Sequence, residues 1–137
     1  MLRAALAFLA TFVVIAAGNA ITHGFLGAAI MAEGLSVLGP AAGAAGEGAA
    51  FLVVAWAAIS AATVWFAAPR PARARAALDG AIVGALFDGG WNIVNRAVVP
   101  AWPLWFAGVD ISWHALHGAA AGIVAHLVWR RFTRPAG

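Results

Sequence analysis

Residues 87–117 read FDGGWNIVNRAVVPAWPLWFAGVDISWHALH, an unusual density of polar side chains within an otherwise apolar sequence. Hydrophobic residues make up 64% of the 137-residue chain and charged residues 9%, against about 25% charged in soluble domains. A soluble fold of this length could not bury so much apolar surface, so the composition predicts a single-domain, all-α integral membrane protein. Ionisable groups are costly inside a bilayer, so residues 87–117 are expected to contain a functional site.

Four segments are long enough to cross a hydrocarbon core of roughly 30 Å at about 1.5 Å per residue. They predict a four-transmembrane-helix bundle with helices at about 2–23, 47–68, 76–99 and 104–129. The first segment is too long for the apolar part of a typical signal peptide, and no clear cleavage site follows it. Glycine breaks and loosely helical spacing between the first two spans predict a short helix lying at the membrane interface, followed by a flexible glycine/alanine connection. Small residues four apart in the last two spans predict close helix packing.

The basic residues predict the orientation of the bundle. All eight are arginines, and with four spans seven of them fall on one side of the membrane. The positive-inside rule therefore predicts cytoplasmic N- and C-termini, in a multi-pass protein of the inner membrane. Arg96 alone falls near the outer side, where it is expected to reach the interface or to pair with Asp110. Trp102 and Trp105 are expected to form the outer aromatic belt. An arginine-only, alanine-rich composition is typical of a GC-rich bacterial genome, and this distribution of charge gives no indication of a nucleic-acid partner.

Polar residues recur at spacings of three and four on three of the predicted helices, which places each set on one helical face. The eight candidate ligand-binding residues are Asn19, His23, Asp88, Asn92, Asn95, Asp110, His114 and His117. Unpaired polar groups cost several kcal/mol in hydrocarbon, so these faces are expected to point inward. They predict a polar pocket between the first, third and fourth spans, open to the outside. The alternative is that they only form interhelical hydrogen bonds, which contribute about 0.6 kcal/mol each on average.

Cofactor chemistry has only weak support in the sequence. Asp110, His114 and His117 could present a carboxylate and two imidazoles to a metal, with His23 as a fourth ligand. This spacing is not a specific signature, so neither a metal nor any other cofactor is predicted. His23 could also face His114 or His117 across a haem, but no other feature of the sequence supports a haem site. There is no cysteine for a thiolate site. No serine lies in a nucleophile elbow, and neither a phosphate loop nor a dinucleotide fingerprint occurs.

Three short runs, FDGGWN, AWPL and VDISWH, resemble motifs of the DUF2177 family of small bacterial inner-membrane proteins. The resemblance lies mainly within residues 80–118, and the matching positions are Asp88, Asn92, Trp102, Pro103, Asp110 and Trp113. The chain departs from the family in having His114 where glycine is usual, Asn19 and His23 where aspartate and tryptophan are expected, and about one extra helical turn before the Trp-Pro pair. The family has no assigned activity, so the resemblance implies a fold and a membrane location but no reaction.

Three kinds of function remain compatible with these features. The first is a pocket that binds or transports a small polar molecule or a lipid headgroup, with Asp88 and Asp110 as the ionisable pair. Because four helices are few for a transporter, that function would require a homodimer. The second is an accessory or structural subunit of a larger membrane complex. The third alternative is a membrane enzyme acting on a lipid or isoprenoid, with His114 or His117 as general base and Asp110 orienting it.

Overall fold

The computed structural model describes residues 1–38 and 45–132, and between residues 45 and 51 it describes the backbone alone. The glycine/alanine connection predicted after the interfacial helix lies largely outside these residues. The described parts are all-helical, without a strand, as predicted. The elements are α1 (Leu2–Ile21), the π-helical segment η1 (Thr22–Leu26), α2 (Ala28–Leu35), α3 (Ala45–Ala67), α4 (Arg73–Val98) and α5 (Leu104–Arg131).

Prolines and one π-helical turn determine where the helices end. Pro69 and Pro71 follow the end of α3, and Pro100 follows the end of α4, because proline cannot donate to the preceding helical turn. At the end of α1, Gly27 N–H donates to Thr22 O at 2.5 Å, across five residues instead of four. This wider turn changes the direction of the side chains that follow α1. Single π-helical turns are frequent at functional sites.

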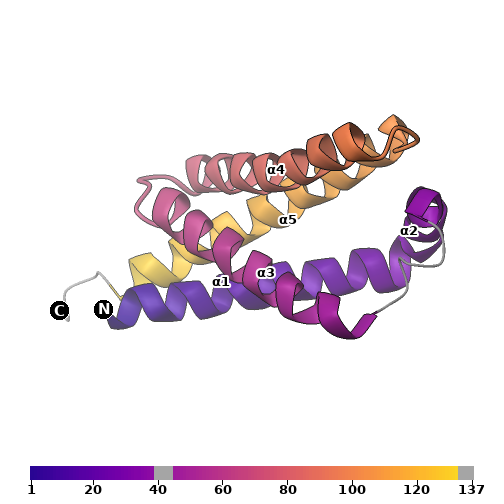
Figure 1. The fold of residues 1–137 in the computed structure, drawn as a ribbon. Helices are drawn as coiled ribbons and strands as arrows, with labels where there is room; N and C mark the ends of the chain where they lie inside the picture. The colour runs from indigo at the N-terminus through magenta and orange to yellow at the C-terminus, as the bar shows by residue number, and fades with distance from the viewer. Residues whose placement is uncertain (39–44, 133–137) are drawn as a thin grey trace.

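Helices α4 and α5 lie side by side along most of their length (Figure 1) and form the most extensive helix pair. Their contact is made by two glycines on each helix, at the spacing that predicted close packing: Gly80, Gly84, Gly118 and Gly122. A Cβ atom on Gly80 would overlap the carbonyl oxygen of Gly118, and one on Gly118 would overlap the carbonyl oxygen of Gly80. The backbones therefore touch directly, which holds polar residues on the two helices within hydrogen-bonding reach.

Apolar side chains lie both inside and outside the bundle. Ile15, Ile59, Val83 and Ala121 form the buried core between α1, α3, α4 and α5. Many large apolar side chains point outward, including Leu9, Val13, Leu86 and Trp91. Together they expose more apolar surface than an ordinary soluble protein does. Among the described residues, two helices are long and apolar enough to cross a membrane, Leu2–Leu26 and Leu104–Arg131, and they coincide with the first and last predicted spans. Polar and charged residues lower the hydropathy of α4.

The segments that carry most of the arginines lie at the same end of the bundle. The start of α1, the turn between α3 and α4, and the end of α5 lie together, whereas α2 and the turn between α4 and α5 lie at the opposite end (Figure 1). Arg3 stacks on the ring of Trp129 at 4.4 Å. Arg70 and Arg75 both pair with Asp79, in the second turn of α4. Arg96 at the other end is exposed and donates to Pro100 O at 2.6 Å, so it does not pair with Asp110.

Candidate functional site

A buried amide at the α4–α5 contact connects two carboxylates. Asn92 Nδ2 donates to Asp88 Oδ2 at 2.9 Å and to Asp110 Oδ2 at 3.2 Å. On its other side, Asn92 Oδ1 accepts a hydrogen bond from Trp102 Nε1 at 2.9 Å. Because an indole N–H can only donate, this contact fixes which way the amide points. Asp88, Asn92 and Asp110 are 8%, 3% and 5% exposed, so this arrangement is shielded from solvent.

His114 of α5 lies between the two carboxylates and α1. Its Nδ1 is 2.9 Å from Asp110 O, 3.3 Å from Asp88 Oδ1 and 3.5 Å from Asp110 Oδ1. Its Nε2 is 3.2 Å from Asn19 Oδ1. Asn19 Nδ2 donates to Ile15 O at 2.9 Å, so the amide oxygen must be the atom that faces His114. Both ring nitrogens therefore face acceptors, which only a doubly protonated ring, or a ring with a cation bound at Nδ1, can satisfy.

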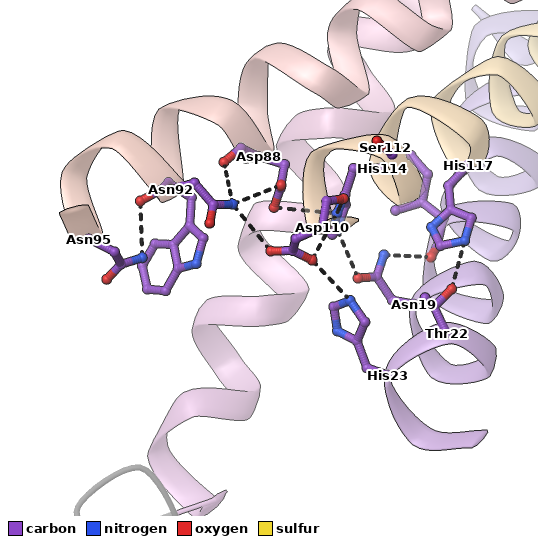
Figure 2. A network of polar contacts seen from close by, with 12 residues as sticks. Asn19, Thr22, His23, Asp88, Asn92, Asn95, Asp110, Ser112, His114 and His117 are labelled. Atoms are coloured by element: carbon purple, nitrogen blue, oxygen red, sulfur yellow. Dashed lines mark hydrogen bonds and ion pairs between the residues drawn. The ribbon is translucent and has the colours of Figure 1, made fainter. Parts of the chain in front are cut away.

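His23 approaches Asp110 from the opposite side. Its Nε2 lies 3.5 Å from Asp110 Oδ1, and neither atom has a hydrogen-bond partner within the described parts of the chain. The imidazole ring also packs against that of His114, with centroids 5.6 Å apart. His23 belongs to η1, so the π-helical turn positions it. Figure 2 shows the rings of His23 and His114 on either side of the Asp110 carboxylate.

A small cavity adjoins the Asp110–His23 pair. Its volume is about 10 Å³, enough for about one water molecule. Ile30 and Met31 of α2 line it, together with Phe106 and Trp113 of α5. The residues that carry the two atoms without hydrogen-bond partners, His23 and Asp110, therefore line a space of about the size of one water molecule next to α2.

His117 lies one turn after His114 on α5, and it contacts α1 instead of the two carboxylates. Its Nε2 is 2.8 Å from Thr22 Oγ1, and the Thr22 hydroxyl donates its proton to Gly18 O at 2.7 Å. His117 Nε2 must therefore donate to Thr22, which leaves Nδ1 with a lone pair; that atom is buried and has no partner among the described residues. A Cβ on Gly18 would lie 2.9 Å from the His117 ring, so glycine lets this ring lie against α1. His117 thus ties α5 to α1.

Six of the eight residues predicted for the site lie in one cluster, which we call the polar cluster: Asn19, His23, Asp88, Asn92, Asp110 and His114. Asn95 is buried one turn beyond Asn92 and donates to Trp91 O of its own helix at 3.0 Å. Of the four residues considered as metal ligands, only His23, Asp110 and His114 bring donor atoms within 4.8 Å of one another. The helical spacing put His117 on the correct face of α5, but one turn too far along.

Two residues of the site were not identified from the residue pattern. Trp102 was expected in an outer aromatic belt; it is instead 2% exposed, because a turn in which Trp102 N–H donates to Val99 O folds the indole back towards Asn92. Its place in the Trp-Pro motif of the family resemblance was the available signal. Thr22 holds His117, and its position three residues after Asn19, on the same helical face, could have indicated it.

The polar cluster contains two carboxylates, and no arginine among the described residues pairs with either of them. Within the described chain, the ion pairs of Asp88 and Asp110 are with histidines, at 3.3 to 3.5 Å. Buried carboxylates in a medium of low dielectric require protons or a cation nearby. The unpartnered atoms, Asp110 Oδ1 and His23 Nε2, can both accept. The arrangement is thus suited to receiving a cation or a hydrogen-bond donor.

Residues 4–127 match the model of a family described as a predicted membrane protein, DUF2177. The match covers most of the chain, so the chain belongs to this family of predicted membrane proteins, as the resemblance in residues 80–118 suggested. The two long apolar helices agree with a membrane protein. No curated protein and no solved structure matches the chain.

Proposed function

We propose that this chain is a bacterial inner-membrane protein with four spans and cytoplasmic ends, whose polar cluster binds a small polar ligand or lipid headgroup, or passes it across the membrane. The observation that carries the proposal is the pair formed by Asp110 Oδ1 and His23 Nε2. Both atoms are buried without a hydrogen-bond partner among the described residues, and their side chains line a cavity. Groups that only joined the helices would be expected to satisfy one another, since buried polar atoms without partners are costly.

The size of the cavity limits what can occupy the site in this conformation. About one water molecule or a single ion fits into about 10 Å³. A larger solute or headgroup would have to displace Ile30 and Met31 of α2, which line the cavity. Helix α2 is short and contacts α5 through Gly34, whose Cα lies against the ring of Phe106. A movement of α2 would open the pocket towards the side of the membrane on which α2 lies.

The proposed orientation predicts the result of reporter fusions. Arg3, Arg70, Arg75 and Arg130 lie on elements that end at one end of the bundle (Figure 1), which the positive-inside rule puts in the cytoplasm. A reporter inserted at Ala72, in the turn between α3 and α4, should report a cytoplasmic position. One inserted at Gly43, outside the described residues, should report the opposite side. The reversed pattern would put the cavity on the cytoplasmic side and overturn an outward-facing pocket.

The substitution Asp110→Asn tests whether Asp110 binds a ligand or only holds the helices together. The asparagine can still accept from Asn92 Nδ2, and the substitution removes one of two neighbouring buried carboxylates. We therefore expect the melting temperature in detergent to stay the same or rise, while the amount of small molecule, lipid or metal retained in native mass spectrometry falls. Asp79→Asn is the matched control. It breaks the pairs with Arg70 and Arg75, so it should lower the melting temperature without changing the retained ligand.

The opposite behaviour of Asp110→Asn would leave only a structural role. If the variant melts at a lower temperature and still carries everything that the wild type carries, the Asp110–His23–His114 contacts only hold helices together. The chain would then fit the alternative of an accessory subunit. Native mass spectrometry of the wild type also reports whether the protein is a homodimer, which transport by so few helices would require.

A further inference from the structure

We infer that the ligand of the polar cluster is a divalent transition-metal ion of the Zn²⁺ type, held by His23 Nε2, Asp110 Oδ1 and His114 Nδ1, with Asp88 Oδ1 beside them. This inference rests on the proposed function, because it names the class of ligand for the same site. It is carried by three side chains from two helical segments whose donor atoms lie within 4.8 Å of one another, and by Asp88 of α4, whose Oδ1 lies 3.3 Å from His114 Nδ1.

The spacing of the donor atoms fits a metal better than it fits direct pairing. Two ligands bound tetrahedrally to zinc at about 2.1 Å lie about 3.4 Å apart. His23 Nε2 and His114 Nδ1 each lie 3.5 Å from Asp110 Oδ1, and His114 Nδ1 lies 3.3 Å from Asp88 Oδ1. These separations are longer than the 2.7–3.2 Å typical of good hydrogen bonds to nitrogen donors. Small shifts of the side chains would place the three atoms of His23, Asp110 and His114 around one ion, with Asp88 Oδ1 next to His114.

Asn92 prepares both carboxylates in the same way. It donates to the Oδ2 atom of Asp88 and to the Oδ2 atom of Asp110, which leaves the Oδ1 atom of each directed at His114. Trp102 in turn fixes the orientation of the Asn92 amide. Carboxylates that bind metals are commonly held by a hydrogen bond on the other oxygen, and these outer contacts raise affinity by about 10–100-fold. The Trp102–Asn92 pair is a buried support of this kind.

Asn19 prepares His114 by the same principle. Its amide oxygen faces His114 Nε2, so that nitrogen must carry a proton. A neutral ring then has its lone pair at Nδ1, the nitrogen that faces the two Oδ1 atoms. A metal-binding histidine almost always donates its other N–H to a fixed acceptor, which sets the tautomer and the ring direction. Nδ1 also lies 2.9 Å from Asp110 O, a carbonyl that can only accept, so in the metal-free protein this nitrogen carries a proton that the ion would replace.

The donor types indicate which ions suit the site. Two imidazoles and two carboxylates match zinc and similar divalent transition metals, whereas Mg²⁺ prefers oxygen ligands alone. The chain has no cysteine, so the site has no thiolate that would favour Cu(I). The adjoining cavity of about 10 Å³ has room for one water molecule as a further ligand.

Calorimetry with Zn²⁺ tests the inference. The full chain in detergent, with any affinity tag removed, is treated with a chelator, dialysed, and titrated with Zn²⁺ alone or with Mg²⁺ alone. We expect one Zn²⁺ per chain and no comparable binding of Mg²⁺. His23→Gln should weaken Zn²⁺ binding by about tenfold or more, because it removes a ligand. His117→Gln is the matched control; it removes a half-buried histidine whose Nε2 contacts Thr22 outside the polar cluster, and binding should stay within about twofold.

The results distinguish the two proposals. Equal losses in His23→Gln and His117→Gln, or a wild type that binds no Zn²⁺, would overturn the metal site. If His23→Gln does not fold, Asp88→Asn tests the site from α4 and should also weaken binding. A wild type without Zn²⁺ binding whose Asp110→Asn variant nevertheless loses a retained organic ligand would leave the proposed function standing without the metal. Failure of both tests would remove both proposals.

Discussion

The variant Gly80→Ala/Gly118→Ala should lose most of its stability as a folded bundle. Each added methyl would overlap a backbone carbonyl oxygen of the facing helix, and neither backbone can yield without moving the whole helix. Overpacking of this kind costs about 1–3 kcal/mol for each site in soluble proteins, and more where backbone must move. The separation of α4 and α5 would also pull Asp110 away from Asn92. Thermal melting in detergent, followed by circular dichroism, measures the loss.

Gly90→Ala on the same helix is the matched control. A Cβ there meets no atom within 4 Å, so the added methyl has open space. Alanine is favoured over glycine inside a helix by about 0.5–1 kcal/mol, so this variant should melt at the same temperature or slightly higher. If the double variant melted at no lower a temperature than Gly90→Ala, the packing of α4 against α5 at Gly80 and Gly118 would have to be looser than the structure shows.

Helical periodicity was sufficient to predict which faces meet. Asp88 and Asn92 share one face of α4, and Asp110 and His114 share one face of α5, because residues four apart lie above one another. Glycines four apart on both helices indicated close approach. Together these patterns predicted that the carboxylates, the amide and His114 would converge, and they do. Local spacing is enough when both helices are regular.

The features that the sequence did not predict arise where the chain is irregular. His23 lies in a π-helical turn over Thr22–Leu26, and nothing in a regular 3.6-residue period anticipates that turn. The turn after Val99 folds Trp102 into the bundle, although a tryptophan near a predicted membrane boundary is usually assigned to an interface. Asn95 and His117 share faces with the polar cluster but lie a turn too far along to join it. Whether two side chains on different helices lie at the same level depends on the axial offset between the helices. The spacing of residues within one helix does not determine that offset.

Asn92→Leu should destabilise the protein more than any other single substitution in the polar cluster. Leucine is similar in size to asparagine, but it can neither donate to the Oδ2 atoms of Asp88 and Asp110 nor accept from Trp102 Nε1. Three buried polar groups would lose a partner together, and each such loss costs about 1–3 kcal/mol. We therefore expect a large fall in melting temperature. We also expect weaker Zn²⁺ binding in any fraction that remains folded, because both carboxylates would be free to rotate.

Asn95→Leu tests the cause of the expected fall in melting temperature. The fall could come from losing the amide that connects the two carboxylates, or from replacing any buried asparagine on α4. Asn95 is as buried as Asp88, but its amide donates only to Trp91 O, a carbonyl of its own helix. Removing it breaks no contact between helices that the structure describes, so the melting temperature should change little and Zn²⁺ binding should stay at the wild-type level. If Asn95→Leu were as damaging as Asn92→Leu, burial of a polar side chain on α4 would explain both results. If Asn92→Leu alone were damaging, the stability of the bundle and the arrangement of its two carboxylates would depend on the same amide.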